Sequence, residues 1–121
     1  RLDPETGDLL EVTTRERPYG IRVGPDGRLW VAYNGTNAIA AVDPETLERR
    51  YYAIPDERTR IRRLDLDSRG RVWYVNSSLG RIGVLDPESG AFSHYHHDPA
   101  DPASLCRRSR RSCNAFGVFC S

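Results

Sequence analysis

Short segments in which apolar and polar residues alternate recur through the first 98 positions of this chain. Residues 21–23, 28–33, 38–42 and 48–54 form one such group, with the turn sequences GPDG, NGTN and DPE between them. Proline, glycine, asparagine and aspartate favour turns because they preset or tolerate the backbone angles that a reversal requires. The alternation and the spacing therefore predict four short antiparallel strands in about 43 residues.

The whole group is repeated further along the chain. Residues 18–52 align without a gap with residues 61–95, at an offset of 43 positions. The identical pairs are Gly27/Gly70, Arg28/Arg71, Trp30/Trp73, Ile39/Ile82, Asp43/Asp86, Pro44/Pro87, Glu45/Glu88 and Tyr52/Tyr95. Four-stranded antiparallel units at this period are typical of β-propeller blades, so the sequence predicts an all-β fold.

The chain divides into four parts by this pattern. Residues 1–17 correspond to the C-terminal half of a blade, residues 18–60 and 61–98 are complete blades, and residues 99–121 match neither. About two and a half blades form an incomplete propeller, since closed rings use about 4–8 blades. The last part is basic and holds all three cysteines, and we expect it to be a disordered tail.

Charge and hydropathy restrict the partners. The formal net charge is only +1, and the arginine run at 107–111 lacks interleaved aromatic residues, so nucleic acid is not expected as a partner. No stretch approaches the ~18–20 apolar residues that cross a bilayer, so we expect no membrane span. Because the chain begins at Arg1, its native N-terminus is expected to be missing, and both a cytoplasmic and an exported location stay open.

The motifs of the two blades resemble a known family. "PYGIRVGPDGRLW" at 18–30, followed by "AIAAVDPET" at 38–46, is similar to the blades of the virginiamycin B lyase (streptogramin lyase) family, and "DSRGRVWYVNSSLGRIGVLDPESG" at 67–90 resembles them equally well. Propellers with NHL repeats and gluconolactonase-like propellers share much of this pattern. The resemblance covers about residues 1–97.

The resemblance implies an enzyme that linearises a cyclic depsipeptide antibiotic by elimination across its ester bond, assisted by magnesium. Members of the family carry a histidine within P-H-G-I and a glutamate after W-F-T in their functional blades. Tyr19 and Arg62 stand at the histidine position here, and Tyr33 and Asn76 at the glutamate position. We therefore expect no catalytic residue in these two blades and no turnover by the chain alone.

Candidate ligand-binding residues are those expected to face the mouth of the propeller channel. They are Tyr19, Arg22, Asn34, Arg62 and Asn76. His94 and His96 share one face of a predicted strand, a spacing that can hold a transition metal. The alternative for these histidines, which we favour, is that an outermost strand simply exposes polar side chains to water.

Two further expectations concern repeated residues. Asp3, Asp43 and Asp86 precede proline, and we expect each carboxylate to bond to its own turn rather than to calcium. Trp30 and Trp73 occupy one register position and are expected to pack between neighbouring blades.

Two functions remain open on the sequence. The chain is either part of a streptogramin-lyase-like propeller or part of a non-catalytic propeller that binds a small ligand or a protein. In both cases an incomplete ring exposes apolar blade faces, so self-association is expected.

Overall fold

The computed structural model describes residues 1–15, 17–98 and 101–110. The first sheet contains β1 (Pro18–Val23), β2 (Leu29–Tyr33), β3 (Ala38–Val42) and β4 (Arg49–Ala53). The second contains β5 (Ile61–Leu66), β6 (Val72–Asn76), β7 (Arg81–Asp86), β8 (Ala91–Asp98) and β9 (Asp101–Arg110). The described residues contain no helix, and hence no helical segment that could cross a membrane.

Both sheets are antiparallel meanders in which each strand pairs with the next along the chain. Their registers repeat after 43 positions: Trp30 lies opposite Ala41 in the first sheet, and Trp73 lies opposite Val84 in the second. The predicted all-β fold of repeated four-stranded units is confirmed. β1 and β5 begin earlier than predicted, at Pro18 and Ile61, because each strand carries a bulge near its start.

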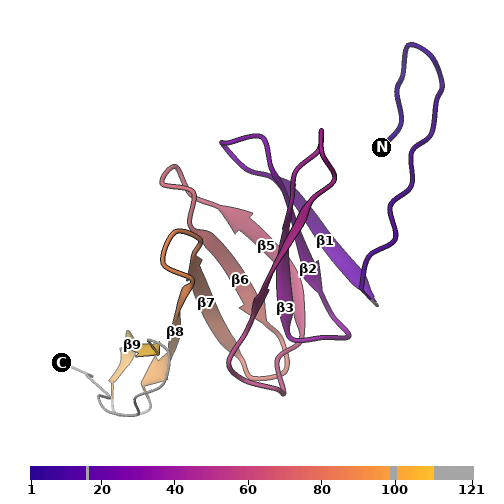
Figure 1. Ribbon diagram of the computed structural model, residues 1–121. Helices are drawn as coiled ribbons and strands as arrows, with labels where there is room; N and C mark the ends of the chain where they lie inside the picture. The colour runs from indigo at the N-terminus through magenta and orange to yellow at the C-terminus, as the bar shows by residue number, and fades with distance from the viewer. Residues whose placement is uncertain (16, 99–100, 111–121) are drawn as a thin grey trace.

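The two sheets lie face to face, and the main hydrophobic core fills the space between them (Figure 1). This core consists of Trp30, Ala32, Ile39, Ala41, Tyr52 and Ile54 from the first blade and Ile61, Leu64, Val72, Tyr74, Leu85 and Phe92 from the second. Because side chains alternate across a strand, each sheet also presents a second face. Trp30 therefore packs between blades as predicted, whereas Trp73 lies half-buried on the outer face of the second sheet.

The three Asp-Pro-Glu sequences form turns in which the aspartate side chain accepts backbone hydrogen bonds. Asp43 Oδ1 accepts from the amide of Glu45 at 2.8 Å, Asp86 Oδ1 from Glu88 at 3.0 Å, and Asp3 Oδ1 from Glu5 at 3.0 Å. The predicted turn role of these aspartates is confirmed. The Asp43 turn ends in Leu47 at a φ of 62°, a left-handed conformation that costs a side-chain-bearing residue about 1–2 kcal/mol.

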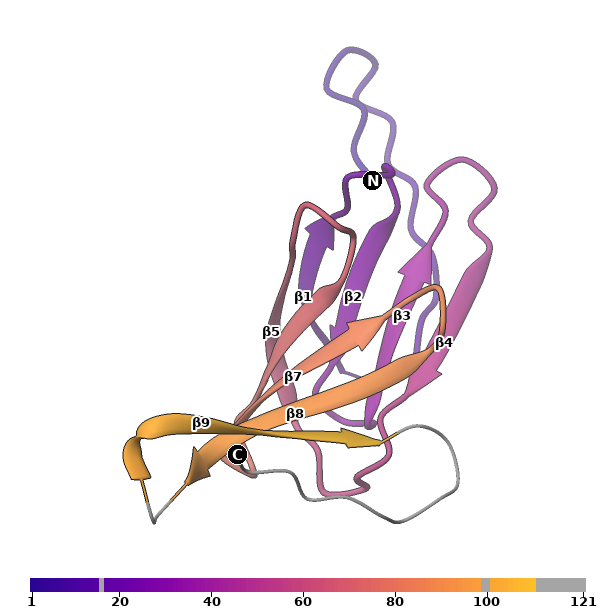
Figure 2. The same cartoon turned by 90° about the vertical axis from the view of Figure 1, so that its left-hand side faces the viewer.

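The C-terminal region differs from the sequence prediction. Residues 101–110 form β9, which pairs antiparallel with β8 as a fifth strand, so the expectation of disorder is wrong for this range (Figure 2). The physical reason is that β8 would otherwise be an edge strand, whose unpaired N–H and C=O groups are a template for any adjacent extended segment. Residues 99–100 and 111–121, including Cys113 and Cys120, lie outside the described residues.

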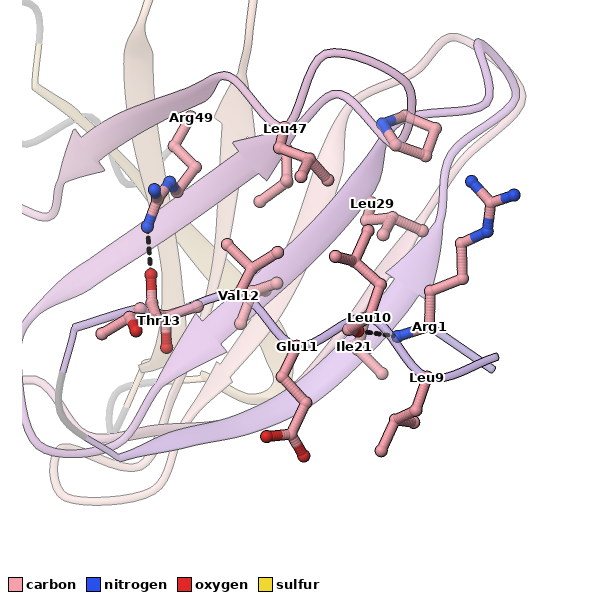
Figure 3. A pocket seen from close by; sticks show the side chains of 14 residues that line it. Arg1, Leu9, Leu10, Glu11, Val12, Thr13, Ile21, Leu29, Leu47 and Arg49 are labelled. Atoms are coloured by element: carbon pink, nitrogen blue, oxygen red, sulfur yellow. Dashed lines mark hydrogen bonds between the residues drawn. The ribbon is translucent and has the colours of Figure 1, made fainter. Parts of the chain in front are cut away.

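The N-terminal region forms less sheet than predicted. Residues 1–10 make a hairpin with a single bridge, between Leu2 and Leu9, and no named strand. A two-stranded hairpin without further strands is marginal, which accounts for the difference. The segment that follows lies against the face of the first sheet that points away from the second, where residues 9–14 enclose an apolar hollow of about 570 Å³ (Figures 1 and 3).

Asp67 anchors the turn between β5 and β6. Its Oδ2 accepts hydrogen bonds from Trp73 Nε1 at 2.9 Å and from Arg71 Nε at 2.7 Å, and its Oδ1 accepts from the amides of Arg69 and Arg71, each at 3.0 Å. Foremost through the bond from Trp73, these contacts lower the pKa of Asp67 from 3.8 to about 2.

We expect Asp67 to make stability depend on acid pH. Because its folded pKa lies below the ordinary value, its contribution is fully present above about pH 4 and is lost as the pH falls towards about 2. Asp67→Asn replaces one carboxylate oxygen, which accepts two hydrogen bonds, with an amide nitrogen, which can only donate. Compared with the unaltered chain, this variant should therefore melt at a lower temperature at pH 7 and lose less stability between about pH 4 and pH 2. Thermal unfolding across this range measures both effects. Asp8→Asn, at an exposed site, is the control. If Asp67→Asn left the dependence of the melting temperature on pH unchanged, the assignment would be contradicted.

Candidate functional site on the inner strands

The first strand of each blade is here called its inner strand. The two inner strands, β1 and β5, lie side by side (Figure 2). Between them is a shallow hollow of about 270 Å³, lined by Tyr19, Gly20, Ile21, Arg22, Arg62, Arg63 and Leu64. Arg22 Nε reaches across the hollow to Asp65 Oδ1 at 4.0 Å. Both partners of this ion pair are exposed, so it contributes little to stability.

The bulges of β1 and β5 decide which side chains face this hollow. In β1 the pairing with β2 shifts between Pro18 and Gly20, which leaves Tyr19 as the extra residue. In β5 the same shift between Ile61 and Arg63 leaves Arg62 as the extra residue, 43 positions later. A bulge re-aims side chains out of the regular alternation. Tyr19 and Arg62 thus occupy one special position in two successive blades.

Three of the five predicted ligand residues come together here. Tyr19, Arg22 and Arg62 line the hollow, and the structure adds Arg63, which the sequence analysis missed. Strict alternation along β5 places Arg62 and Arg63 on opposite faces, and the bulge removes that separation. The sequence indicated that Tyr19 and Arg62 occupy equivalent positions of the two blades. Two examples of one position do not show that the strand bulges there.

The other two predicted residues hold the backbone instead. Asn76 at the end of β6 is fully buried. Its Oδ1 accepts from the amide of Arg60 at 3.3 Å and from Ser78 Oγ at 2.9 Å, while its Nδ2 donates to Thr59 Oγ1 at 3.1 Å. Asn76 therefore fastens the segment that joins the two blades, and it does not face the hollow.

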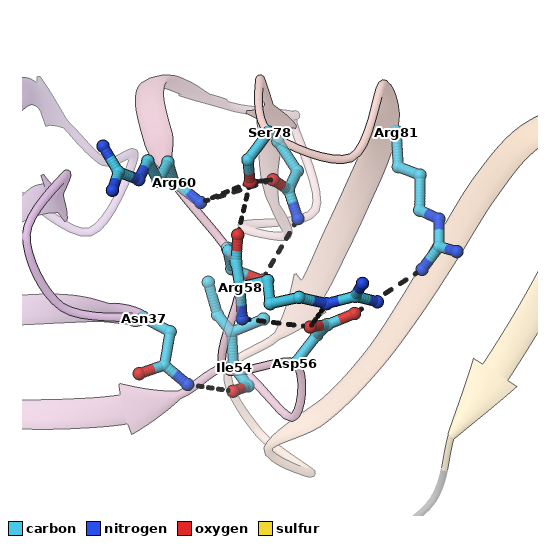
Figure 4. A network of polar contacts seen from close by, with 9 residues as sticks. Asn37, Ile54, Asp56, Arg58, Arg60, Ser78 and Arg81 are labelled. Atoms are coloured by element: carbon cyan, nitrogen blue, oxygen red, sulfur yellow. Dashed lines mark hydrogen bonds and ion pairs between the residues drawn. The ribbon is translucent and has the colours of Figure 1, made fainter.

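Asn34 directly follows β2. Its Nδ2 donates to the carbonyl of Ile61 at 3.4 Å, and its amide donates to the carbonyl of Arg17 at 2.9 Å. The linking segment is further held by Asp56, whose Oδ2 lies 3.8 Å from a guanidinium nitrogen of Arg81 (Figure 4). Both asparagines thus connect the blades and are absent from the residues that line the hollow.

His94 also differs from the expectation of a water-exposed side chain. It is buried, and its ring packs edge-on against that of Tyr74 with centroids 6.3 Å apart. The reason is that His94 follows Phe92 by two positions and shares its face, which points into the space between the sheets. The side chain of His96 lies outside those described, and the described residues contain no group of three or more His, Cys, Asp or Glu that could hold a metal ion.

The chemistry of the hollow is that of hydrogen-bond donors. Three guanidinium groups line it, and a guanidinium stays protonated and only donates. None of the described lining residues carries a carboxylate or an imidazole. At the position of the family's glutamate in the first blade stands Tyr33, and burial raises the pKa of its phenol, so this group is neutral near pH 7. The arrangement is suited to holding carbonyl or carboxylate oxygens.

Comparisons with known proteins identify the fold. No protein-family model matches the chain. A solved structure of virginiamycin B lyase from Staphylococcus aureus superposes with a TM-score of 0.62 and 25% identity, over 69% of this chain and 28% of that chain. A catalytically inactive variant of virginiamycin B lyase from S. aureus, solved with quinupristin, gives a TM-score of 0.58 and 17% identity, over 90% of this chain and 46% of that chain.

Two further proteins are similar. A streptogramin B lyase structure matches at a TM-score of 0.54 and 19% identity, over 74% of this chain and 36% of that chain. A gluconolactonase from Zymomonas mobilis subsp. mobilis is 60% identical over 30 residues, which are 25% of this chain and 8% of that protein. The chain therefore spans less than half the length of each of these relatives. Its two sheets are β-propeller blades similar to those of the virginiamycin B and streptogramin B lyases.

Proposed function

We propose that this chain provides ligand-binding blades of a streptogramin-lyase-like β-propeller and that the two blades hold the ligand without supplying the catalytic base. The observation that carries the proposal is the pair of bulges that aims Tyr19 and Arg62 into one hollow. These are the positions at which members of the family carry their histidine. A tyrosine and three arginines there donate hydrogen bonds to the many carbonyl groups of a cyclic depsipeptide.

Magnesium, the metal that the family implies, does not fit these residues. The hollow is lined by guanidinium groups, which repel a cation, and the described residues hold no cluster of carboxylates or imidazoles around it. We therefore assign no metal-dependent step to these blades. A propeller that binds a ligand without any elimination is the second candidate, and the same donor-only lining favours it.

Quinupristin, the compound present with one of the similar lyases, is the probe for this proposal. We expect it to change the tyrosine and tryptophan fluorescence of the chain on binding, and we expect chromatography to show no ring opening with magnesium present. Arg62→Ala removes a charged donor, which should weaken binding about tenfold. Arg69→Ala, a turn arginine outside the hollow, is the matched control.

Each result separates the alternatives. Ring opening by the chain alone would contradict the absence of a base in these blades. Binding that Arg62→Ala leaves unchanged would place the ligand elsewhere, and no binding of quinupristin at all would reject the proposed ligand class.

A further inference from the structure

The face of the second sheet that points away from the first sheet repeats, 43 positions later, a surface of the first sheet on which a blade packs. No described blade packs on this face of the second sheet. In the first sheet, Trp30, Ala32, Ile39, Ala41 and Tyr52 lie against the second sheet and are buried. Their equivalents after 43 positions are Trp73, Val75, Ile82, Val84 and Tyr95, which we call the Trp73 face. Here Val75 is 51% exposed and Ile82 is 41% exposed, Trp73 and Tyr95 are half-buried, and Val84 is buried.

The internal geometry of the two faces is also alike. Trp30 stacks on Tyr52 with ring centroids 5.8 Å apart, and Trp73 stacks on Tyr95 at the same distance. The Trp73 face is therefore already arranged as the surface on which a blade packs. In the first sheet, the second blade packs on this surface and presents Leu64, Val72, Tyr74 and Leu85 to it.

The chain carries a second surface of that matching kind. The equivalents of Leu64, Val72, Tyr74 and Leu85 are Ile21, Leu29, Val31 and Val42, which we call the Ile21 face. All four line the hollow of about 570 Å³ under residues 9–14, and Ile21 is 56% exposed (Figure 3). The covering segment is held at its ends by polar contacts, from Arg49 to the carbonyl of Thr13 and between Arg1 and Leu10.

We propose that copies of this chain associate head to tail, with the Trp73 face of one copy on the Ile21 face of the next. The contact repeats between molecules the packing that joins the two blades within one molecule, and residues 9–14 are displaced from the Ile21 face. Such an interface is heterologous, because two different surfaces meet, and it closes only if the rotation per copy completes a ring. With two blades in each copy, about two to four copies give a ring of ordinary blade number.

Sedimentation velocity on the whole chain, without ligand, tests the proposal independently of the proposed function. We expect a discrete oligomer for the unaltered chain. Ile82→Arg charges the Trp73 face and Ile21→Arg charges the Ile21 face, and either should weaken association at least about 100-fold, because a guanidinium would be buried unpaired. Both residues are exposed in the single chain, so circular dichroism should show unchanged strands.

Mixing the two variants distinguishes this arrangement from other contacts. The Ile21→Arg copy keeps an intact Trp73 face and the Ile82→Arg copy keeps an intact Ile21 face, so an equimolar mixture should form a dimer and nothing larger. Leu2→Arg, at an exposed site outside both faces, should leave the oligomer unchanged. A monomeric unaltered chain, or variants that associate alone as the unaltered chain does, would overturn the proposal.

Discussion

Replacing Trp30 with alanine is expected to lower the free energy of unfolding by about 3–5 kcal/mol, the cost of emptying a large aromatic site in a core. Trp30 is 1% exposed and belongs to the cluster between the two sheets. Loss of its ring removes contacts from both blades at once. Because whole domains are stable by only about 5–15 kcal/mol, this change should affect the assembly of the two blades more than any surface substitution.

The same substitution at Trp73 is the matched control, since both residues occupy one register position. Trp73 is only half-buried, so Trp73→Ala should cost less than Trp30→Ala in a single molecule, although it also removes the hydrogen bond to Asp67. Urea denaturation measures both values. The Ile21→Arg background keeps the molecules apart, which matters because association would add to the apparent stability. Equal costs for the two tryptophans in that background would show that burial between the blades is not what Trp30 contributes.

The repeat allowed most of the fold to be predicted, because a fixed offset of 43 residues constrains every strand at once. The turns at Asp43 and Asp86 followed from local chemistry, since the aspartate bonds to amides two and three residues ahead in the first of them. What sequence could not supply was the difference between Trp30 and Trp73. The two residues occupy equivalent strands, but a neighbouring blade covers only Trp30, and only Trp73 donates a hydrogen bond to an aspartate, because the position equivalent to Asp67 in the first blade is Gly24.

The candidate site was predicted only in part, and the reason is geometric. Tyr19, Arg22 and Arg62 line one hollow, and Arg63 joins them through a bulge, which breaks the alternation on which strand predictions rest. Asn76 was expected at a channel mouth and is instead fully buried. Its three hydrogen bonds go to residues near it in space, at positions that a pattern of apolar and polar letters does not encode.

Gly83 shows how the two blades solve the same packing problem with different residues. It lies directly opposite Tyr74 in the pairing of β6 with β7, whereas the equivalent pair in the first blade is Ala40 opposite Val31. A Cβ atom at Gly83 would overlap the buried ring of Tyr74, lying 2.6 Å from Cε2 and closer still to Cζ. The ring of Tyr74 thus requires glycine, which has no side chain, at position 83.

We therefore expect Gly83→Ala to destabilise the chain by about 3 kcal/mol, because overpacking forces a buried ring out of its position. In a Tyr74→Val background, which recreates the pair of the first blade, the same substitution should cost nothing or stabilise slightly, as alanine suits a strand better than glycine. Tyr74→Phe keeps the ring and should give no rescue. A double-mutant cycle by urea denaturation measures the coupling, expected above about 1.5 kcal/mol. Additive costs would mean that Tyr74 moves aside freely, and the tight fit between these two strands would then not limit which residues the repeat accepts.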